Sequence, residues 1–160
     1  MESPTEDLLR KIEDSFKNLG AQIDASKQGL IILKVALQDL TNAIKIIVEQ
    51  LGISHLSTMT SLDLGENIDV LYHFWKRDLI ASVRVSVAKS NKHAPSIVGI
   101  VPGAILYEME VHDMFGVTFD GNPWMDRRLL LPENYPTDLP PPLLKETKPS
   151  EIRKAVGVER

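Results

Sequence analysis

The sequence predicts an α+β fold, in which a small mixed or antiparallel sheet of about five strands is covered by two N-terminal helices. A third helix and an extended, proline-rich C-terminal arm follow. Three observations lead to this prediction. Two N-terminal segments repeat apolar residues at helical spacing, the segments between residues 21 and 87 alternate apolar and polar residues or form β-branched runs, and six of the ten prolines lie after residue 131.

The first helix is expected to begin at Ser3 and Pro4 and to stop at Gly20. Ser3 can cap the helix, Pro4 suits the first helical position, and Glu6 stands where a capping box needs an acid. Glycine at the end supplies a left-handed residue that helices use to terminate. Residues 40–51 form the clearest amphipathic helix, which Gly52 ends.

Strands are expected at residues 21–25, 30–37, 53–62, 68–75 and 79–87, the third of them irregular. The last two are joined by residues 76–78, a connection short enough for an antiparallel hairpin. Pro102 can begin the helix that ends near Phe115, and residues 150–157 are expected to form one or two helical turns. We expect residues 1–122 to form the globular domain and residues 123–160 the partner-docking arm.

Composition excludes several function classes. The net charge of −4 leaves no basic stripe for nucleic acid. The chain has no cysteine, so it offers no disulfide, thiolate nucleophile or iron–sulfur ligand of its own, and its four histidines lack metal-ligand spacing. The acidic N-terminus does not resemble a signal peptide, and no apolar run is long enough to span a bilayer. We therefore expect no cofactor, no metal, no catalytic residue and no membrane span in this chain.

Three acids, Glu108, Glu110 and Asp113, stand in an otherwise apolar stretch that is followed by Arg127 and Arg128. Three interpretations compete: a solvated helix face, an ion-pair clamp that pins the arm to the domain, and an acid/base catalytic pair. The clamp is favoured, because a buried carboxylate must be paired and arginine grips carboxylates in a bidentate way. Catalysis is least favoured, because no nucleophile or phosphate-binding loop lies nearby.

The arm carries several large apolar residues on a backbone that prolines keep out of sheets and helices. These are Leu129, Leu130, Leu131, Tyr135, Leu139, Leu143 and Leu144. Such side chains must either lie back on the domain or bind a partner. Because two helices are already expected to cover the sheet, we predict that the arm docks on another chain and is poorly ordered without it.

Residues 68–146 resemble the 30 kDa-type subunit of NADH–quinone oxidoreductases, which are complex I enzymes, and the equivalent subunit of complex I-related membrane-bound nickel–iron hydrogenases. The family pattern is roughly E-R-E, D-M-F-G-I, F-x-G-H-P, L-R-R-I-L-L-P and P-L-R-K-D. The residues matched here, which the resemblance implies are structural or partner-binding, are Glu108, Glu110, Asp113, Gly116, Phe119, Gly121, Pro123, Arg127, Arg128, Leu130, Pro132, Pro142 and Lys145. Three positions depart from the pattern: Met109 and Leu144 replace arginines, and Leu106 replaces an aromatic residue.

The resemblance implies a non-catalytic scaffold in the peripheral electron-transfer arm of a membrane-bound, ion-translocating oxidoreductase, with the hydrogenase type slightly favoured over the NADH–quinone type. Its partners would be the large catalytic subunit and the small iron–sulfur subunit, which would hold the iron–sulfur clusters and, in a hydrogenase, the nickel–iron centre. They would hold the chain peripherally on the cytoplasmic side of the membrane, in a hetero-oligomer. The alternative is a free-standing interaction module that binds another partner through its proline-rich arm.

Overall fold

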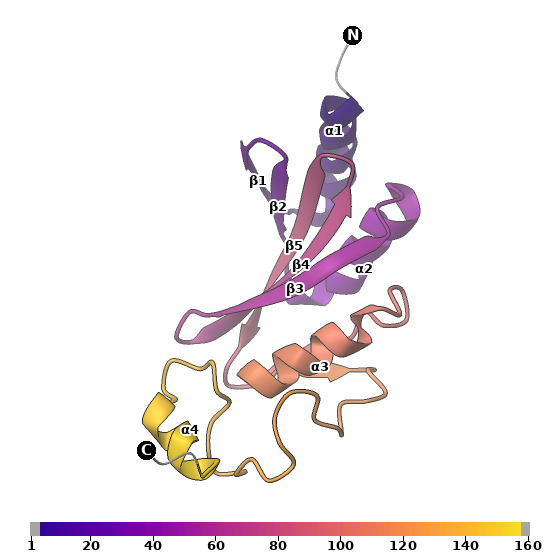
Figure 1. Cartoon of the computed structure of the whole chain (residues 1–160). Helices are drawn as coiled ribbons and strands as arrows, with labels where there is room; N and C mark the ends of the chain where they lie inside the picture. Colours follow the sequence, from indigo (N-terminus) through magenta and orange to yellow (C-terminus); the bar gives the residue numbers. More distant parts are fainter. Residues whose placement is uncertain (1–3, 158–160) are drawn as a thin grey trace.

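A five-stranded mixed sheet lies at the centre of the computed structural model, which describes residues 4–157 (Figure 1). The strands are β1 (Gln22–Lys27), β2 (Leu30–Lys34), β3 (His55–Asp63), β4 (Asn67–Lys76) and β5 (Leu79–Ala88). Their order is β1-β2-β5-β4-β3, with β2 and β5 parallel and the other neighbours antiparallel. The predicted α+β class and mixed sheet are therefore confirmed. β3 is irregular at one point, where its register shifts between Leu56 and Thr58.

The hairpin of β4 and β5 forms as predicted. Lys76 pairs with Leu79, so the turn between them has two residues, and Arg77 has a φ of 56°. A positive φ suits the turns whose twist matches that of two antiparallel strands.

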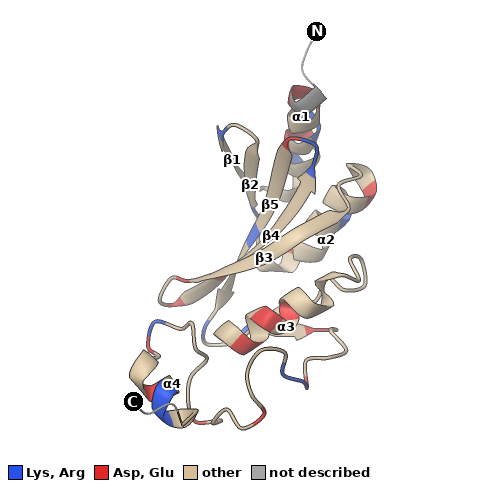
Figure 2. Ribbon diagram, viewed as in Figure 1, with Lys and Arg blue, Asp and Glu red and all other residues tan. Residues whose placement is uncertain are grey.

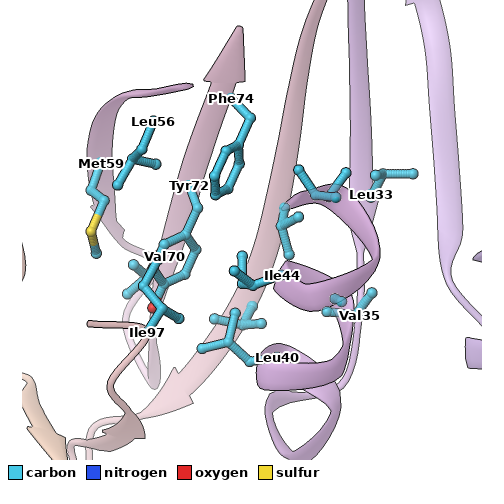
Figure 3. Packing of buried hydrophobic residues seen from close by; sticks show 14 of the residues in the cluster. Leu33, Val35, Leu40, Ile44, Leu56, Met59, Val70, Tyr72, Phe74 and Ile97 are labelled. Atoms are coloured by element: carbon cyan, nitrogen blue, oxygen red, sulfur yellow. The ribbon is translucent and has the colours of Figure 1, made fainter. Parts of the chain in front are cut away.

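Two helical segments cover one face of this sheet. α1 (Pro4–Phe16) continues into a 3₁₀ turn and ends at Gly20, whose φ of 60° confirms the predicted stop, whereas Ser3 lies outside the described residues. α2 (Leu40–Lys45) follows a 3₁₀ turn at Leu37–Asp39 and continues as a π-helical turn, Ile46–Gln50. Alternate residues of β4, among them Val70, Tyr72 and Phe74, are buried in one core with Leu40 and Ile44 of α2 (Figure 3).

The third helix, α3 (Ala104–Phe115), packs beside β3, where the Tyr107 hydroxyl donates to the carbonyl of Ser57 at 3.0 Å. Two short parallel strands flank α3 in the chain, β6 (His93–Pro95) before it and β7 (Thr118–Asp120) after it. The sequence pattern did not predict this strand pair. Gly116 ends α3 in the left-handed region, with a φ of 76°. Among residues 4–157, none of the helices has the length and apolar character that crossing a bilayer needs.

The arm folds back by successive turns, so the prediction of an extended arm is not confirmed. Residues 121–148 contain no helix or strand, and backbone hydrogen bonds close turns at 132–135, 136–139 and 141–144. Pro142 occupies the second position of the last of these turns, where its fixed φ is favoured. The chain then forms α4 (Pro149–Ala155), which confirms the predicted helical turns at the end of the sequence (Figure 1). The boundary at residues 122 and 123 stays a prediction.

One arm residue, Leu144, packs on the domain itself, contrary to the expectation that the arm is buried only by another chain. Leu144 is 3% exposed and belongs to the main core. Tyr135 is 5% exposed, and its hydroxyl donates to the carbonyl of Pro140 within the arm. The turns bring Leu144 back to the domain, which an extended backbone could not do. Leu130 and Leu143 remain more than half exposed.

Candidate functional site

Glu108 is fully buried and links three segments of the chain. The Ile97 backbone N–H donates to its Oε1 at 2.8 Å, and the Ser96 hydroxyl and the Asn122 side-chain amide each donate to its Oε2 at 2.8 Å. The carboxyl group therefore fixes the loop before α3 and the turn after β7 against the helix. Burial raises the pKa of Glu108, and the three donors lower it by less, so the pKa lies above its ordinary value.

Tyr72 lies in the core behind this carboxyl group. Its hydroxyl is buried and has no hydrogen-bond partner among the described residues. Burial, followed by the negative charge of Glu108, raises the pKa of Tyr72 well above its ordinary value, so the side chain stays a neutral phenol.

Asp113 attaches the arm to α3. Its Oδ2 accepts hydrogen bonds from three successive backbone N–H groups, those of Leu129 at 2.9 Å, Leu130 at 2.7 Å and Leu131 at 3.1 Å. Its Oδ1 is buried and finds no donor in the part of the chain that the structure describes. Since Asn122 is also bound to the carbonyl of Ile105 at the start of α3, the segment 122–131 runs along the helix from its beginning to its end.

The predicted arginine clamp is wrong. Neither arginine forms a salt bridge with Glu108, Glu110 or Asp113. The Arg127 guanidinium instead lies 5.7 Å from the Trp124 ring and 4.0 Å from Asp126. The Arg128 guanidinium lies 5.6 Å from the Tyr135 ring. Figure 2 marks acidic residues on the ribbon of α3 and basic residues on the loop that follows β7. The physical reason is that backbone, hydroxyl and amide donors bind both oxygens of Glu108 and Oδ2 of Asp113 without immobilising long arginine side chains. The arm is pinned, but through its backbone.

A second carboxylate, Asp63, holds the far end of the arm, and the sequence did not single it out. It accepts hydrogen bonds from the backbone N–H groups of Lys145 and Gly65, both at 2.8 Å, and from the Lys89 ammonium at 2.7 Å, which also binds Glu146 at 2.9 Å. Burial opposes ionisation, but these donors outweigh it and lower the pKa of Asp63 to about 2. The Asp-x-Gly sequence signals a local turn, but no local pattern reveals a contact with Lys145.

The remaining predicted residues divide by exposure. Phe119 is fully buried, and at Gly116 an added Cβ would lie 2.9 Å from Cγ of Pro141, so glycine is needed for this close approach. Pro142 is half-buried. The predicted residues that lie on the surface are Glu110, Gly121, Pro123, Arg127, Arg128, Leu130, Pro132 and Lys145. Glu110 thus fits the interpretation of a solvated helix face. Within residues 4–157, no three His, Asp or Glu side chains are grouped to hold a metal ion.

Comparison with known proteins gives consistent results. The family model described as the respiratory-chain NADH dehydrogenase 30 kDa subunit matches residues 33–152. The C subunit of the NADH-quinone oxidoreductase of Moorella thermoacetica is 26% identical over 134 residues, which cover 81% of this chain and 88% of that protein.

Two further matches differ in how much they cover. The C/D subunit of the NADH-quinone oxidoreductase of Aeromonas salmonicida is 41% identical over 68 residues, which are 41% of this chain and 11% of that protein, so the match spans far less than two thirds of that relative. A chain from the solved membrane-bound sulfane sulfur reductase, an archaeal respiratory membrane complex, superimposes with a TM-score of 0.74 at 20% identity, over 99% of this chain and 94% of that one. The two chains share a fold.

Proposed function

The chain belongs to the respiratory-chain NADH dehydrogenase 30 kDa subunit family, and on this basis we propose that it is a scaffold subunit of a membrane-bound respiratory complex. In this proposal it is a non-catalytic part of the peripheral electron-transfer arm of an ion-translocating oxidoreductase. It lies on the cytoplasmic side of the membrane and is held there by partner subunits.

The main support for the scaffold role is that the arm exposes large apolar side chains while hydrogen bonds hold its backbone in place. Carboxyl groups fix its backbone at both ends, Asp113 near residues 129–131 and Asp63 at residue 145. Between and beside these points Leu129 is 39% exposed, Leu130 54% and Leu143 55%. Large apolar side chains held outward on a fixed backbone are typical of a protein–protein contact surface.

We assign the redox centres of the complex to the partner subunits. Iron–sulfur clusters need thiolate ligands, and the sequence contains no cysteine. The large catalytic subunit and the small iron–sulfur subunit would therefore hold the clusters and any nickel–iron centre, and this chain would position them. No residue of the chain is given a catalytic role.

Within this family we favour a hydrogenase-type complex over an NADH–quinone type. The support comes from the signature, where Met109, Leu144 and Leu106 depart from the family pattern. Met109 and Leu144 are each 3% exposed, so both departures place apolar residues in the interior where the pattern has arginine.

Purification of the native complex through a tag on this chain tests the proposal. We expect the large and small subunits to co-purify, and the complex to contain iron and to evolve hydrogen from a reduced donor. NADH oxidation without hydrogen evolution would refute the hydrogenase preference. Recovery of the chain alone, as a stable monomer from membranes and cytosol alike, would refute the scaffold proposal.

Point variants test the docking surface. Leu130→Ser and Leu143→Ser should each reduce co-purification, because their side chains would be buried by the partner. Ile80→Ser is the control, because Ile80 is also an exposed apolar residue, at 39%, but lies on β5 beside the β4–β5 turn. Equal yields of complex from all three variants would contradict docking through the arm.

A further inference from the structure

A cavity of about 340 Å³ lies between the C-terminal end of α3 and the arm. Helix residues His112 and Asp113 form one side, and Asp126, Arg128 and Tyr135 are among the arm residues that form the other. The arm side of the cavity consists of turns and loops without helix or strand.

Within residues 4–157, Asp113 forms no salt bridge with a basic side chain. The side chain is 3% exposed, and the three donors to its Oδ2 are neutral backbone N–H groups. Its Oδ1 is buried without a hydrogen bond from any described residue. A buried carboxylate oxygen with no donor costs free energy, and a donor brought to it recovers that cost.

The three basic side chains that line this cavity make their contacts away from Asp113. Arg127 lies over the Trp124 ring and near Asp126, and Arg128 lies over the Tyr135 ring. His112 uses its Nδ1 on the carbonyl of Val117, at 2.9 Å. None of the three therefore supplies the missing donor to Asp113.

We propose that this cavity receives the guanidinium group of an arginine from a partner subunit, which donates a hydrogen bond to Oδ1 of Asp113. Guanidinium fits better than the ammonium of lysine for two reasons. It is less strongly hydrated, and its planar fork can reach a second acceptor, the carboxylate of Asp126, which lines the same cavity. The inference rests on the proposed function, because the arginine belongs to another subunit of the complex.

A titration of the isolated chain tests the site without any partner. Acetylarginine amide, added to ¹⁵N-labelled protein, should shift the amide signals of Leu129, Leu130 and Leu131 in a saturable way. The neutral isostere acetylcitrulline amide should not. Asp113→Asn should abolish the shifts, because the asparagine amide oxygen can still accept from the three N–H groups while its nitrogen places a donor where the guanidinium would bind.

The control variant is Asp138→Asn, which makes the same chemical change on the arm outside the cavity. It should bind the arginine probe as the unaltered chain does. In the tagged complex, Asp113→Asn should weaken association with the large subunit at least about tenfold, since losing a buried charged contact at an interface typically has an effect of this size or more.

The results of these experiments distinguish a failure of the proposed cation site from a failure of the proposed function. If the unaltered chain fails to join a complex but binds acetylarginine amide through Asp113, the proposed function is wrong and the cation site stands. If arginine and citrulline probes act alike, or Asp113→Asn joins the complex as well as the unaltered chain, the inference is wrong. Should Asp113→Asn fail to fold, as judged from its amide spectrum, the comparison of the two probes on the unaltered chain still decides.

Discussion

Replacing Glu108 by alanine should destabilise the domain strongly. The change removes the acceptor of three hydrogen bonds, which the N–H of Ile97, the hydroxyl of Ser96 and the amide of Asn122 donate, although the Asn122 amide keeps its bond to the carbonyl of Ile105. Each buried unsatisfied group costs about 1–3 kcal/mol, and losing the buried carboxyl group, whose burial is itself unfavourable, offsets part of the sum. We expect a loss of about 3–5 kcal/mol, a large part of the stability of a domain of this size.

Urea unfolding at neutral pH measures this loss, with an unchanged m-value as the sign that both variants unfold to the same state. Glu110→Ala is the matched control, because Glu110 lies on the same helix but is exposed, and it should change stability by less than about 0.5 kcal/mol. Glu108→Gln should cost about 1–3 kcal/mol, since its amide oxygen can still accept from Ile97 while its amide nitrogen opposes that of Asn122. Equal stabilities of Glu108→Ala and Glu110→Ala would refute this account.

The pH dependence gives an independent check on Glu108. Because burial raises the pKa of this carboxyl group in the folded state, the folded protein binds its proton more tightly than the unfolded chain does. Its contribution to stability is therefore complete below about pH 4.3, the ordinary value for glutamate, and is lost as the pH rises through the folded pKa. Glu108→Gln should lack this decline, and the same decline in both proteins would exclude Glu108 as its source.

Three further predictions concern the arm. The pKa of Asp63 is lowered to about 2, so its carboxylate should stabilise the arm above about pH 3.9 and lose this effect as the pH falls through 2. In Asp63→Asn, the free energy of unfolding measured in urea should therefore fall less on going to acid pH. Leu144→Ala should cost about 2–5 kcal/mol in thermal or urea unfolding and Leu130→Ala less than about 0.5, because only the first side chain lies in the core; equal effects would place the arm off the domain. Gly116→Ala should cost more than about 1 kcal/mol, because its φ is positive and its new methyl group would meet Pro141; unchanged stability would contradict that contact.

The structural matches support a fold that the amino-acid pattern already indicates. Alternation of apolar and polar residues predicted β4 and β5 and the hairpin between them, because the period of two in a strand is a local property. Helical spacing and terminal glycines likewise predicted α1 and α2. The pair β6 and β7 escaped prediction, since strands of three residues carry too few positions to show a period.

The sequence by itself singled out Glu108, Glu110 and Asp113 together, because carboxyl groups among apolar residues must find partners. It did not show that Glu110 is exposed while the other two are buried. It also determined that redox ligands of the thiolate type are absent. It could not determine which partners the acids take, and the arginines chosen from proximity in the chain were the wrong ones. Only the tertiary structure decided this, since backbone N–H groups are present at every residue except proline and the sequence does not mark which of them the fold brings to a carboxylate.

In the arm, too, some features follow from the sequence and others depend on the tertiary structure. Proline content predicted that the segment from Pro123 onward forms no sheet or helix, because proline lacks the N–H that both need, and residues 123–148 indeed contain neither. Whether such a segment extends or folds back depends on contacts between residues far apart in sequence, such as the N–H of Lys145 on Asp63 and the side chain of Leu144 in the core. Those contacts exist only once the sheet has formed, so the course of the arm was decided by the tertiary structure.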